Sequence, residues 1–334
     1  MPASLLDGRV NEARPAWALG ASLLLTLVLG GTSAAAETLT ALAVEKVIPF
    51  EVTYSHLENY DTRLLFASDA LWTVVHPNLV RIDPKSYGQT NIELPGVLGP
   101  VRPLAFGEGA IWIADTGSNT IFKVDAANDR VALKMKASLL SVQSPIAVGA
   151  GSLWMVTAEH AERVVTRFDA MTGEVQAQIE LPDVGSGVAF DGGSVWAAGR
   201  NEIYRIDPAA NAVVASTPIC DRPSTLAAGE GSIWVHCRND GIVNRIDSAT
   251  GVVTGSLDVG VKGPGMVDLT TGGGHLWLAS LVIRLIEIDP ATVELRKAFE
   301  SDLHTEANVA YGDNSLWLLR IRPKGEILRL SAPD

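Results

Sequence analysis

Histidine is the side chain best suited to acid–base chemistry or metal binding near neutral pH, and this chain of 334 residues has six. His304 and Glu306 stand two residues apart, so this base and carboxylate could hold a metal ion or move a proton. His236 ends a short apolar run and is the third candidate. We take His304, Glu306 and His236 as candidate catalytic residues, although so few side chains do not make a complete site.

A second group of polar residues is predicted to bind a ligand. Its members share a place in the connections that differ most along the chain, and they are His56, His76, Arg102, Asp115, Glu159, His160, Arg200, Arg222, Arg238 and Lys262. Asn119, Arg284 and Arg320 fall in similar connections. The group is more basic than the rest of the chain, which favours an anionic or polar small ligand. The alternative interpretation is ordinary loop charge in contact with water.

Sequence motifs with a known catalytic mechanism are missing. The chain has no Gly-x-Ser-x-Gly, His-Glu-x-x-His, Cys-x-x-Cys or Gly-x-x-x-x-Gly-Lys segment, and no calcium loop of the Asp-x-Asp-x-Asp-Gly kind. The glycine-rich pieces, such as Gly272 to Gly274, recur at regular intervals and are interpreted as turns. The sequence therefore favours binding over catalysis.

The first 36 residues are predicted to be a signal peptide. Arg9 and Arg14 precede an apolar run from Ala16 to Leu29, and Ala34 to Ala36 precede Glu37, where the mature chain is expected to begin. Export implies a periplasmic or secreted protein, and no later apolar run suggests membrane insertion of the mature chain. The formal net charge of -12 argues against nucleic acid as a partner.

Two cysteines, Cys220 and Cys237, complete the inventory of reactive side chains. In an oxidising compartment they are a possible disulfide, while two unpaired thiols remain the alternative.

Tryptophans show how these residues must be positioned. Seven of the eight recur at intervals of 38 to 43 residues, and they are Trp72, Trp112, Trp154, Trp196, Trp234, Trp277 and Trp317. Only Trp17 lies outside the series. Such a period is typical of a repeat protein.

Each repeat contains four short predicted strands. Strand A is an apolar run before a glycine-rich turn, strand B carries the tryptophan, strand C ends in an aspartate, and strand D alternates apolar and polar residues. The aspartates, several of them followed by proline, are Asp83, Asp125, Asp169, Asp207, Asp247 and Asp289, and they are expected to open a turn. Repeats of four strands are typical of propeller blades. The blades are predicted at about 63–100, 103–142, 145–184, 187–222, 225–264, 268–305, and 308–334 together with 38–50.

The seventh repeat ends after its strand C, at Glu326 to Leu330, and Leu39 to Val47 can supply the missing strand. Pairing of these two segments would close the ring and remove free sheet edges. A solenoid is disfavoured because it needs capping repeats. The sequence therefore predicts an all-β protein, a seven-bladed β-propeller of four-stranded antiparallel blades closed by an N-terminal strand, in residues 37–334.

The two faces of this ring are predicted to differ. Because strands alternate in direction, the D to A and B to C connections share one face, the loop face, and the A to B and C to D turns share the other, the turn face. The candidate ligand-binding residues surround the channel mouth on the loop face, where five of the histidines also lie; His275 lies on the turn face. The tryptophans are expected to pack between blades. Basic residues two positions before the aspartates, Arg81, Lys123, Arg167, Arg205 and Arg245, are expected to serve an exposed sheet face or a turn carboxylate.

The segments Ala227 to Trp234 and Arg245 to Val252 resemble the YVTN-type and streptogramin B (virginiamycin B) lyase-like propeller repeats. The resemblance implies a seven-bladed propeller; its lyase members use a metal ion with histidine and carboxylate residues, which cannot be matched to positions here. We expect a monomeric binding or interaction module that engages a small molecule or partner protein at the channel mouth. The alternative is a metal-assisted lyase or ring-opening enzyme, and only this alternative implies a divalent metal such as Mg²⁺.

Overall fold

The computed structural model describes residues 40–41, 43–49, 63–96, 101–140, 146–159, 162–183, 185, 187–263, 267–280, 284–300, 308–320 and 325–331. The chain divides into two units, 1–36 and 37–334, and the described residues all belong to the second. The predicted signal peptide therefore lies outside the described residues. Among these residues the structure contains strands and turns only.

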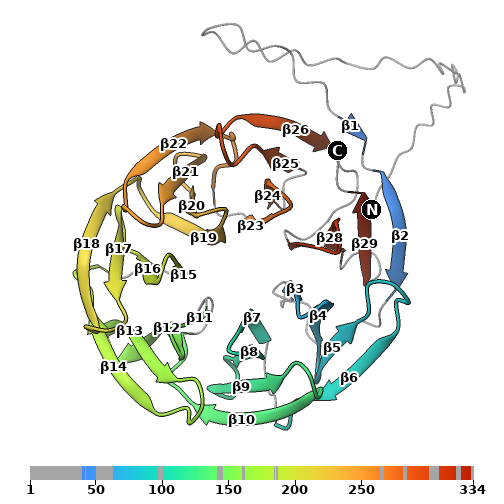
Figure 1. Ribbon diagram of the computed structural model, residues 1–334, viewed down its shortest axis with the longest axis horizontal. Coiled ribbons are helices and arrows are strands. Elements are labelled where there is room, and N and C mark those ends of the chain that lie inside the picture. The colour runs from blue at the N-terminus through green and yellow to red at the C-terminus, as the bar shows by residue number, and fades with distance from the viewer. Residues whose placement is uncertain are drawn as a thin grey trace, which may run out of the picture. The chain divides into compact units, whose positions relative to one another are not determined.

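Seven antiparallel blades make up the second unit (Figure 1). Blade one is β3 (Leu64–Ala67), β4 (Ala70–Val75), β5 (Asn78–Ile82) and β6 (Gln89–Glu93). Blade two is β7 (Val101–Gly107), β8 (Ala110–Asp115), β9 (Thr120–Asp125) and β10 (Arg130–Lys136). Blade three is β11 (Ile146–Gly149), β12 (Ser152–Glu159), β13 (Glu162–Asp169) and β14 (Val175–Glu180), and blade four is β15 (Val188–Asp191), β16 (Ser194–Ala198), β17 (Glu202–Asp207) and β18 (Ala212–Pro218).

The remaining blades close the ring. Blade five is β19 (Pro223–Gly229), β20 (Ser232–Cys237), β21 (Ile242–Asp247) and β22 (Val253–Asp258), and blade six is β23 (Val267–Gly272), β24 (His275–Ser280), β25 (Arg284–Ile288) and β26 (Leu295–Glu300). Blade seven is β27 (Val309–Gly312), β28 (Ser315–Arg320), β29 (Glu326–Ser331) and β2 (Val44–Pro49). The innermost strands contact one another in sequence, and β27 contacts β3, which completes the circle (Figure 1). The predicted fold class is confirmed.

Closure by an N-terminal strand is also confirmed, with a shift in position. The strand was predicted at Leu39 to Val47, but β2 pairs antiparallel with β29 from Val44 opposite Leu330 to Pro49 opposite Glu326. Ile48 explains the shift, because it is the buried residue of β2 and packs in the cluster that contains Trp317. A short strand before it, β1 (Thr40–Ala41), pairs parallel with β26 of blade six.

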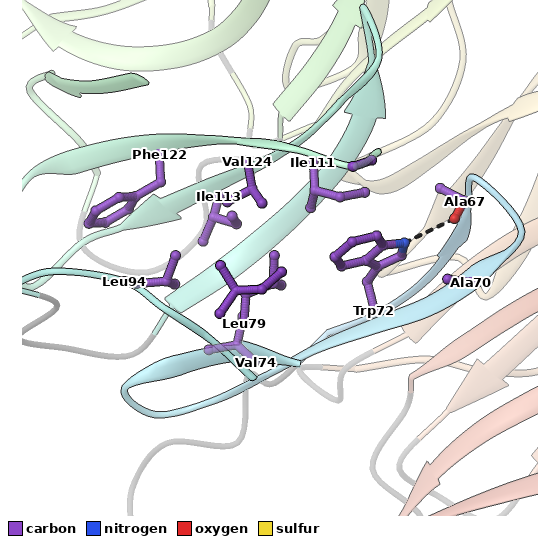
Figure 2. Close-up of a cluster of buried hydrophobic side chains, with 12 residues drawn as sticks. Ala67, Ala70, Trp72, Val74, Leu79, Leu94, Ile111, Ile113, Phe122 and Val124 are labelled. Atoms are coloured by element: carbon purple, nitrogen blue, oxygen red, sulfur yellow. Dashed lines mark hydrogen bonds between the residues drawn. The ribbon is translucent and has the colours of Figure 1, made fainter. Parts of the chain in front are cut away.

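The seven tryptophans are all buried between blades, as the sequence predicts. Trp72 of blade one, for example, packs in one cluster with Ile111 and Ile113 of blade two, and its indole nitrogen donates a hydrogen bond to the carbonyl of Ala67 (2.9 Å; Figure 2). The same bond, to the carbonyl five residues earlier, is made in every blade but the sixth. All seven tryptophans thus fill the space between sheets, and six of them also fix strand B to strand A of their own blade.

A cation on strand C of six blades lies over the tryptophan of its own blade, at 5.0 to 5.9 Å from the ring centroid. We call these side chains the interblade cations: Arg81, Lys123, Arg167, Arg205, Arg245 and Arg329. Five of them also donate a hydrogen bond to a carbonyl in the C to D turn of the next blade; Arg329 of blade seven, for instance, reaches Pro84 of blade one. Arg81 instead lies 3.8 Å from the Asp129 carboxylate. The first five were predicted to serve an exposed sheet face or a turn carboxylate. Only Arg81 of these five lies beside a carboxylate of the next blade, while the others reach turn carbonyls.

Those carboxylates stabilise their own turns. Asp169 Oδ1, for example, accepts the amide hydrogens of Met171 and Thr172 at 2.8 Å each. These hydrogen bonds lower the pKa of the Asp169 carboxyl, and the Ser86 amide lowers that of Asp83. Side-chain hydrogen bonds are the largest cause of the lowered pKa of Asp125, Asp247 and Asp289, from Asn128, Thr250 and Arg296 respectively.

Blade six departs from the pattern because Glu287 occupies the position of the interblade cation, opposite Trp277. The fourth strand of blade seven is β2, so no turn joins its third and fourth strands and no turn carbonyl is available to a cation. Buried Glu287 instead contacts His275, with 2.7 Å between Oε1 and Nδ1. Arg296 Nη1 lies 2.9 Å from the same Nδ1. Glu287 Oε2 and Trp277 Nε1 have no hydrogen-bond partner among the described residues.

Candidate functional site

A central channel of about 470 Å³ runs between the innermost strands of all seven blades. Its end at the loop face is polar and is lined by Arg63, Ser224, Thr225, Arg238 and Asp268. Its end at the turn face is mostly apolar. The two ends therefore suit different ligands.

An ion pair crosses the channel lining at the polar end. Arg63, just before β3, places Nη1 3.0 Å from Asp268 Oδ1 on β23. The other oxygen of Asp268 accepts the amide hydrogen of Val309 in blade seven (3.1 Å). Burial raises the pKa of the Asp268 carboxyl, while Arg63 and the Val309 amide oppose the rise. With both oxygens engaged, Asp268 connects blades six, seven and one.

Four of the predicted ligand-binding residues come together on the loop face, in blades four and five. We call them the basic loops: Arg200, Arg222, Arg238 and Lys262. The Arg222 amide donates to the Arg200 carbonyl (2.7 Å), the Arg238 amide donates to the Arg222 carbonyl (3.2 Å), and the amide of Gly263, next to Lys262, donates to the Arg238 carbonyl (3.0 Å). Backbone hydrogen bonds thus hold four separate connections in one row. Arg200, Arg222 and Lys262 are exposed, and Arg238 is half-buried at the channel.

A disulfide bond fixes this row. Cys220 and Cys237, whose Cα atoms are 6.1 Å apart, are bonded, so the connection before β19 is tied to the end of β20. Asn244 Nδ2 lies 3.1 Å from Cys237 Sγ and supports the same place from β21. Arg222 and Arg238 follow the two cysteines closely in sequence. The bond therefore restricts the segments that carry these two arginines of the basic loops.

His236 lies beneath the basic loops and is 1% exposed. Its Nε2 is 2.9 Å from the Val261 carbonyl, and its Nδ1 is 3.1 Å from the Ser224 hydroxyl. Because a carbonyl only accepts, Nε2 carries the hydrogen and Nδ1 is the acceptor. Burial lowers the pKa of His236. This candidate catalytic residue is therefore a neutral side chain that positions two loops, with both ring nitrogens engaged.

Other candidates have structural partners or lie outside the described residues. Asp115 is buried and accepts hydrogen bonds from the Gly117 amide and the Ser118 hydroxyl, which closes its own loop. Asn119 Oδ1 accepts the Leu139 amide (3.2 Å), and Arg320 pairs with Glu326. His76 lies in the turn between β4 and β5. The backbone of Arg102 lies in β7, that of Glu159 ends β12 and that of Arg284 begins β25. His56, His160, His304 and Glu306 lie outside the described residues.

Metal binding receives no support from the part of the chain that is described. Within it, no three or more His, Cys, Asp or Glu side chains are arranged to hold a metal ion. The same residues include no helix with the length and hydropathy that a bilayer span requires.

No protein-family model matches the chain, and no curated protein does either. Solved structures, in contrast, match the chain. The chain has a β-propeller fold. A chain of a structure titled "Crystal Structure of Mitotic Checkpoint Complex" superposes with a TM-score of 0.69 at 12% identity, covering 92% of this chain and 100% of that one. BamB from Moraxella catarrhalis superposes with a TM-score of 0.58 at 11% identity, covering 86% and 100%. At these identities the likeness concerns the fold alone.

The site contains residues that the sequence did not single out. Arg63, Ser224, Thr225 and Asp268 line the channel, but each stands within or beside a segment that was interpreted only as strand A. Their signal in the sequence is a polar side chain at the start of an otherwise apolar run.

Proposed function

We propose that this chain is an exported binding module whose basic loops receive an acidic group of a partner protein or small molecule. The observation that carries the proposal is the state of Arg238. Its side chain lines the polar end of the channel and forms no ion pair with any described residue. A cation at a concave mouth without a charged partner favours an anionic ligand.

The neighbouring charges strengthen this proposal. Arg200, Arg222 and Lys262 add three exposed cations beside Arg238, on a protein whose net charge is -12. Asp221 immediately precedes Arg222 in the sequence, and its Oδ2 accepts a hydrogen bond from Asn239 (2.7 Å). A local basic surface on an acidic body attracts and orients an acidic ligand at this one place.

A rigid surface suits binding. The disulfide and the backbone hydrogen bonds hold the basic loops, so little conformational freedom is lost when a ligand arrives. Among the structural neighbours, one is a chain of a mitotic checkpoint complex, so that propeller works within an assembly. We infer the same type of role here, as a non-enzymatic interaction module.

Binding of labelled peptides tests the proposal. A glutamate-rich 12-residue peptide is expected to raise its fluorescence anisotropy with the wild-type protein, and Arg222→Glu with Arg238→Glu is expected to weaken the affinity at least tenfold. Arg130→Glu is the matched control, because Arg130 is exposed on the turn side of β10. Equal affinity for the double variant and the wild type would contradict the proposed site.

The enzyme alternative stays a prediction. It requires at least two of the loop-face histidines to lie near a carboxylate. Both ring nitrogens of His236 are hydrogen-bonded instead, to the Ser224 hydroxyl and the Val261 carbonyl. Of the other residues it would use, His76 lies in the turn between β4 and β5, while His56, His160, His304 and Glu306 are outside the described residues. Membership of the YVTN-type or streptogramin B lyase-like group is likewise a proposal, supported by the blade motifs of the sequence.

A further inference from the structure

The turn-face end of the channel is lined by the last residue but one of strand A in each blade. Phe66, Phe106, Phe190 and Tyr311 occupy this position in blades one, two, four and seven, and we call them the aromatic collar. The other three blades contribute Val148, Ala228 and Thr271. Phe106 is 42% exposed, and its three aromatic partners are half-buried. Large rings left in contact with solvent around a cavity are a feature of binding sites.

Glycine residues of the preceding blades lie against three of these rings. A Cβ atom added to Gly312 would overlap Phe66, one on Gly149 would overlap Phe190, and one on Gly272 would overlap Tyr311. These three rings therefore pack directly against backbone. Phe66 also stacks on Trp317, with ring centroids 6.5 Å apart.

Carboxylates surround the collar. The A to B turns that follow it carry Asp69, Glu108, Glu230 and Asp313, and strand A of blade four ends in Asp191. The turn residues of this set are exposed, and none of the A to B turns contains lysine or arginine. The C to D turns add the aspartates from Asp83 to Asp289 to the same face. Both sets of carboxylates thus lie on the side opposite the basic loops.

Several of these carboxylates are not neutralised. Asp313 pairs with Arg329, but Asp69 and Glu230 form no ion pair with a described residue. Asp191 ends strand A of blade four, where blade one has Ala67 and the other five blades have glycine. Its Oδ2 atom is buried without a hydrogen-bond partner among the described residues. A buried carboxylate oxygen without a donor is completed by a cationic or N–H donor group.

Aromatic faces and carboxylates together select one class of ligand. The faces of Phe and Tyr rings attract a cation, and arginine and lysine combine such a cation with an apolar stem that fits an aromatic cavity. Carboxylates spread around the whole collar match several positive charges at once, which a peptide segment offers and a small cation does not. Charge complementarity of this kind also guides the approach of the partner.

We propose that the turn face binds a lysine- or arginine-rich peptide segment of a partner protein, with one basic side chain inserted into the aromatic collar. This site is separate from the basic loops and does not depend on the function proposed for them. The two faces would hold partners of opposite charge, and the protein would connect them.

Peptide titrations test this site. The probes are a labelled 12-residue peptide rich in arginine and lysine, a peptide with glutamine at every basic position, and choline as a small cation. The basic peptide is expected to bind the wild type, the neutral peptide at least tenfold more weakly, and raised salt is expected to weaken binding. The proposal would be overturned if the basic peptide did not bind, or if the neutral peptide bound with the same affinity as the basic one. It would also be overturned if choline, at the same concentration as the basic peptide, displaced that peptide from the protein.

Two variants test the aromatic collar and the carboxylates of the A to B turns separately. Phe106→Leu keeps an apolar side chain but removes an exposed ring, and Asp69→Asn with Glu230→Gln removes charge while asparagine tolerates the positive φ of 55° at position 69. Each is expected to lower affinity for the basic peptide at least fivefold. Glu93→Gln, an exposed carboxylate on the outer strand β6, is the matched control. Unchanged affinity in both folded variants, judged by their circular dichroism and Tm, would refute the assignment.

Discussion

Arg329 of blade seven donates a hydrogen bond from Nη1 to the carbonyl oxygen of Pro84 in blade one, over 2.9 Å. The two residues are 245 positions apart, and the bond spans the joint at which the ring closes. The same guanidinium lies 5.1 Å from the Trp317 ring centroid and 3.0 Å from the Asp313 carboxylate. Arg329 thus contacts its own blade through Trp317 and Asp313 and joins that blade to blade one through Pro84.

Replacing Arg329 by alanine is expected to destabilise the whole propeller. The variant loses the bond to Pro84 and the contact with Trp317, so the free energy of unfolding should fall by about 2 kcal/mol. Urea denaturation followed by tryptophan fluorescence measures this. Arg130→Ala serves as the control because its side chain is 72% exposed, and a loss of similar size there would argue against a special role of the joint.

The closing strand offers a second test at adjacent residues. Ile48 is 3% exposed and packs in the cluster of Trp317, whereas Val47 is 41% exposed. Ile48→Ala is expected to lower the free energy of unfolding by about 2 to 4 kcal/mol, and Val47→Ala by less than about 1 kcal/mol. Thermal unfolding of both variants checks the difference. If both have the wild-type Tm, β2 does not close the ring in solution.

Reduction of the disulfide is expected to weaken the fold and the binding of acidic peptides. Cys220 and Cys237 are 17 residues apart, and a loop of this size corresponds to about 3 kcal/mol of stability. The basic loops would also gain freedom. Thermal unfolding with and without reductant measures the first effect, and anisotropy with the glutamate-rich peptide measures the second. A reduced protein that unfolds at the same temperature would contradict the first expectation.

Acid is expected to destabilise the protein through His236. Burial lowers its pKa from the ordinary value of 6.5, so below that pH the unfolded chain binds a proton that the folded protein excludes. Stability from this residue is therefore complete above pH 6.5 and is lost as the pH falls toward the lower, folded pKa. Denaturation at several pH values should show a smaller loss between pH 7 and 5 for His236→Gln than for the wild type. Parallel pH curves for the two proteins would rule this out.

Blade six allows a test of why its interblade cation is replaced. No turn joins the third and fourth strands of blade seven, so a cation at position 287 would be buried without a carbonyl acceptor, and His275 would lose its carboxylate partner. Glu287→Arg is expected to cost about 3 kcal/mol. Lys123→Arg, at the same position of blade two, is expected to stay within about 0.5 kcal/mol of the wild type. A stabilised Glu287→Arg variant would show that blade six accepts the cation after all.

The sequence predicted the fold well because each blade solves the same packing problem with the same residue. A tryptophan such as Trp72 must fill the space to the next sheet, so its spacing reports the blade directly. The closing strand was misplaced by a few residues because only Ile48 of β2 is buried, which the apolar content of the segment does not reveal.

The candidate site was less predictable. Arg222 and Arg238 were recognised separately, but their neighbourhood depends on backbone bonds between loops from different strands. Arg63 and Asp268 meet only because the ring closes. The collar was missed since Phe106 has the pattern of an ordinary core residue, and its exposure follows from its place at a channel that no single blade contains.

The pairing of β2 with β29 also has a consequence for the order in which the protein folds. β2 precedes blade one and is synthesised before every blade, yet its partner on blade seven is synthesised after the other six. Contacts between segments this far apart form slowly, because a long loop must close first. Blades one to five can each assemble from neighbouring residues, so we expect Val44–Pro49 to wait unpaired until the final stage. The strand that holds the ring shut is thus also the one that must be protected longest from pairing with another chain.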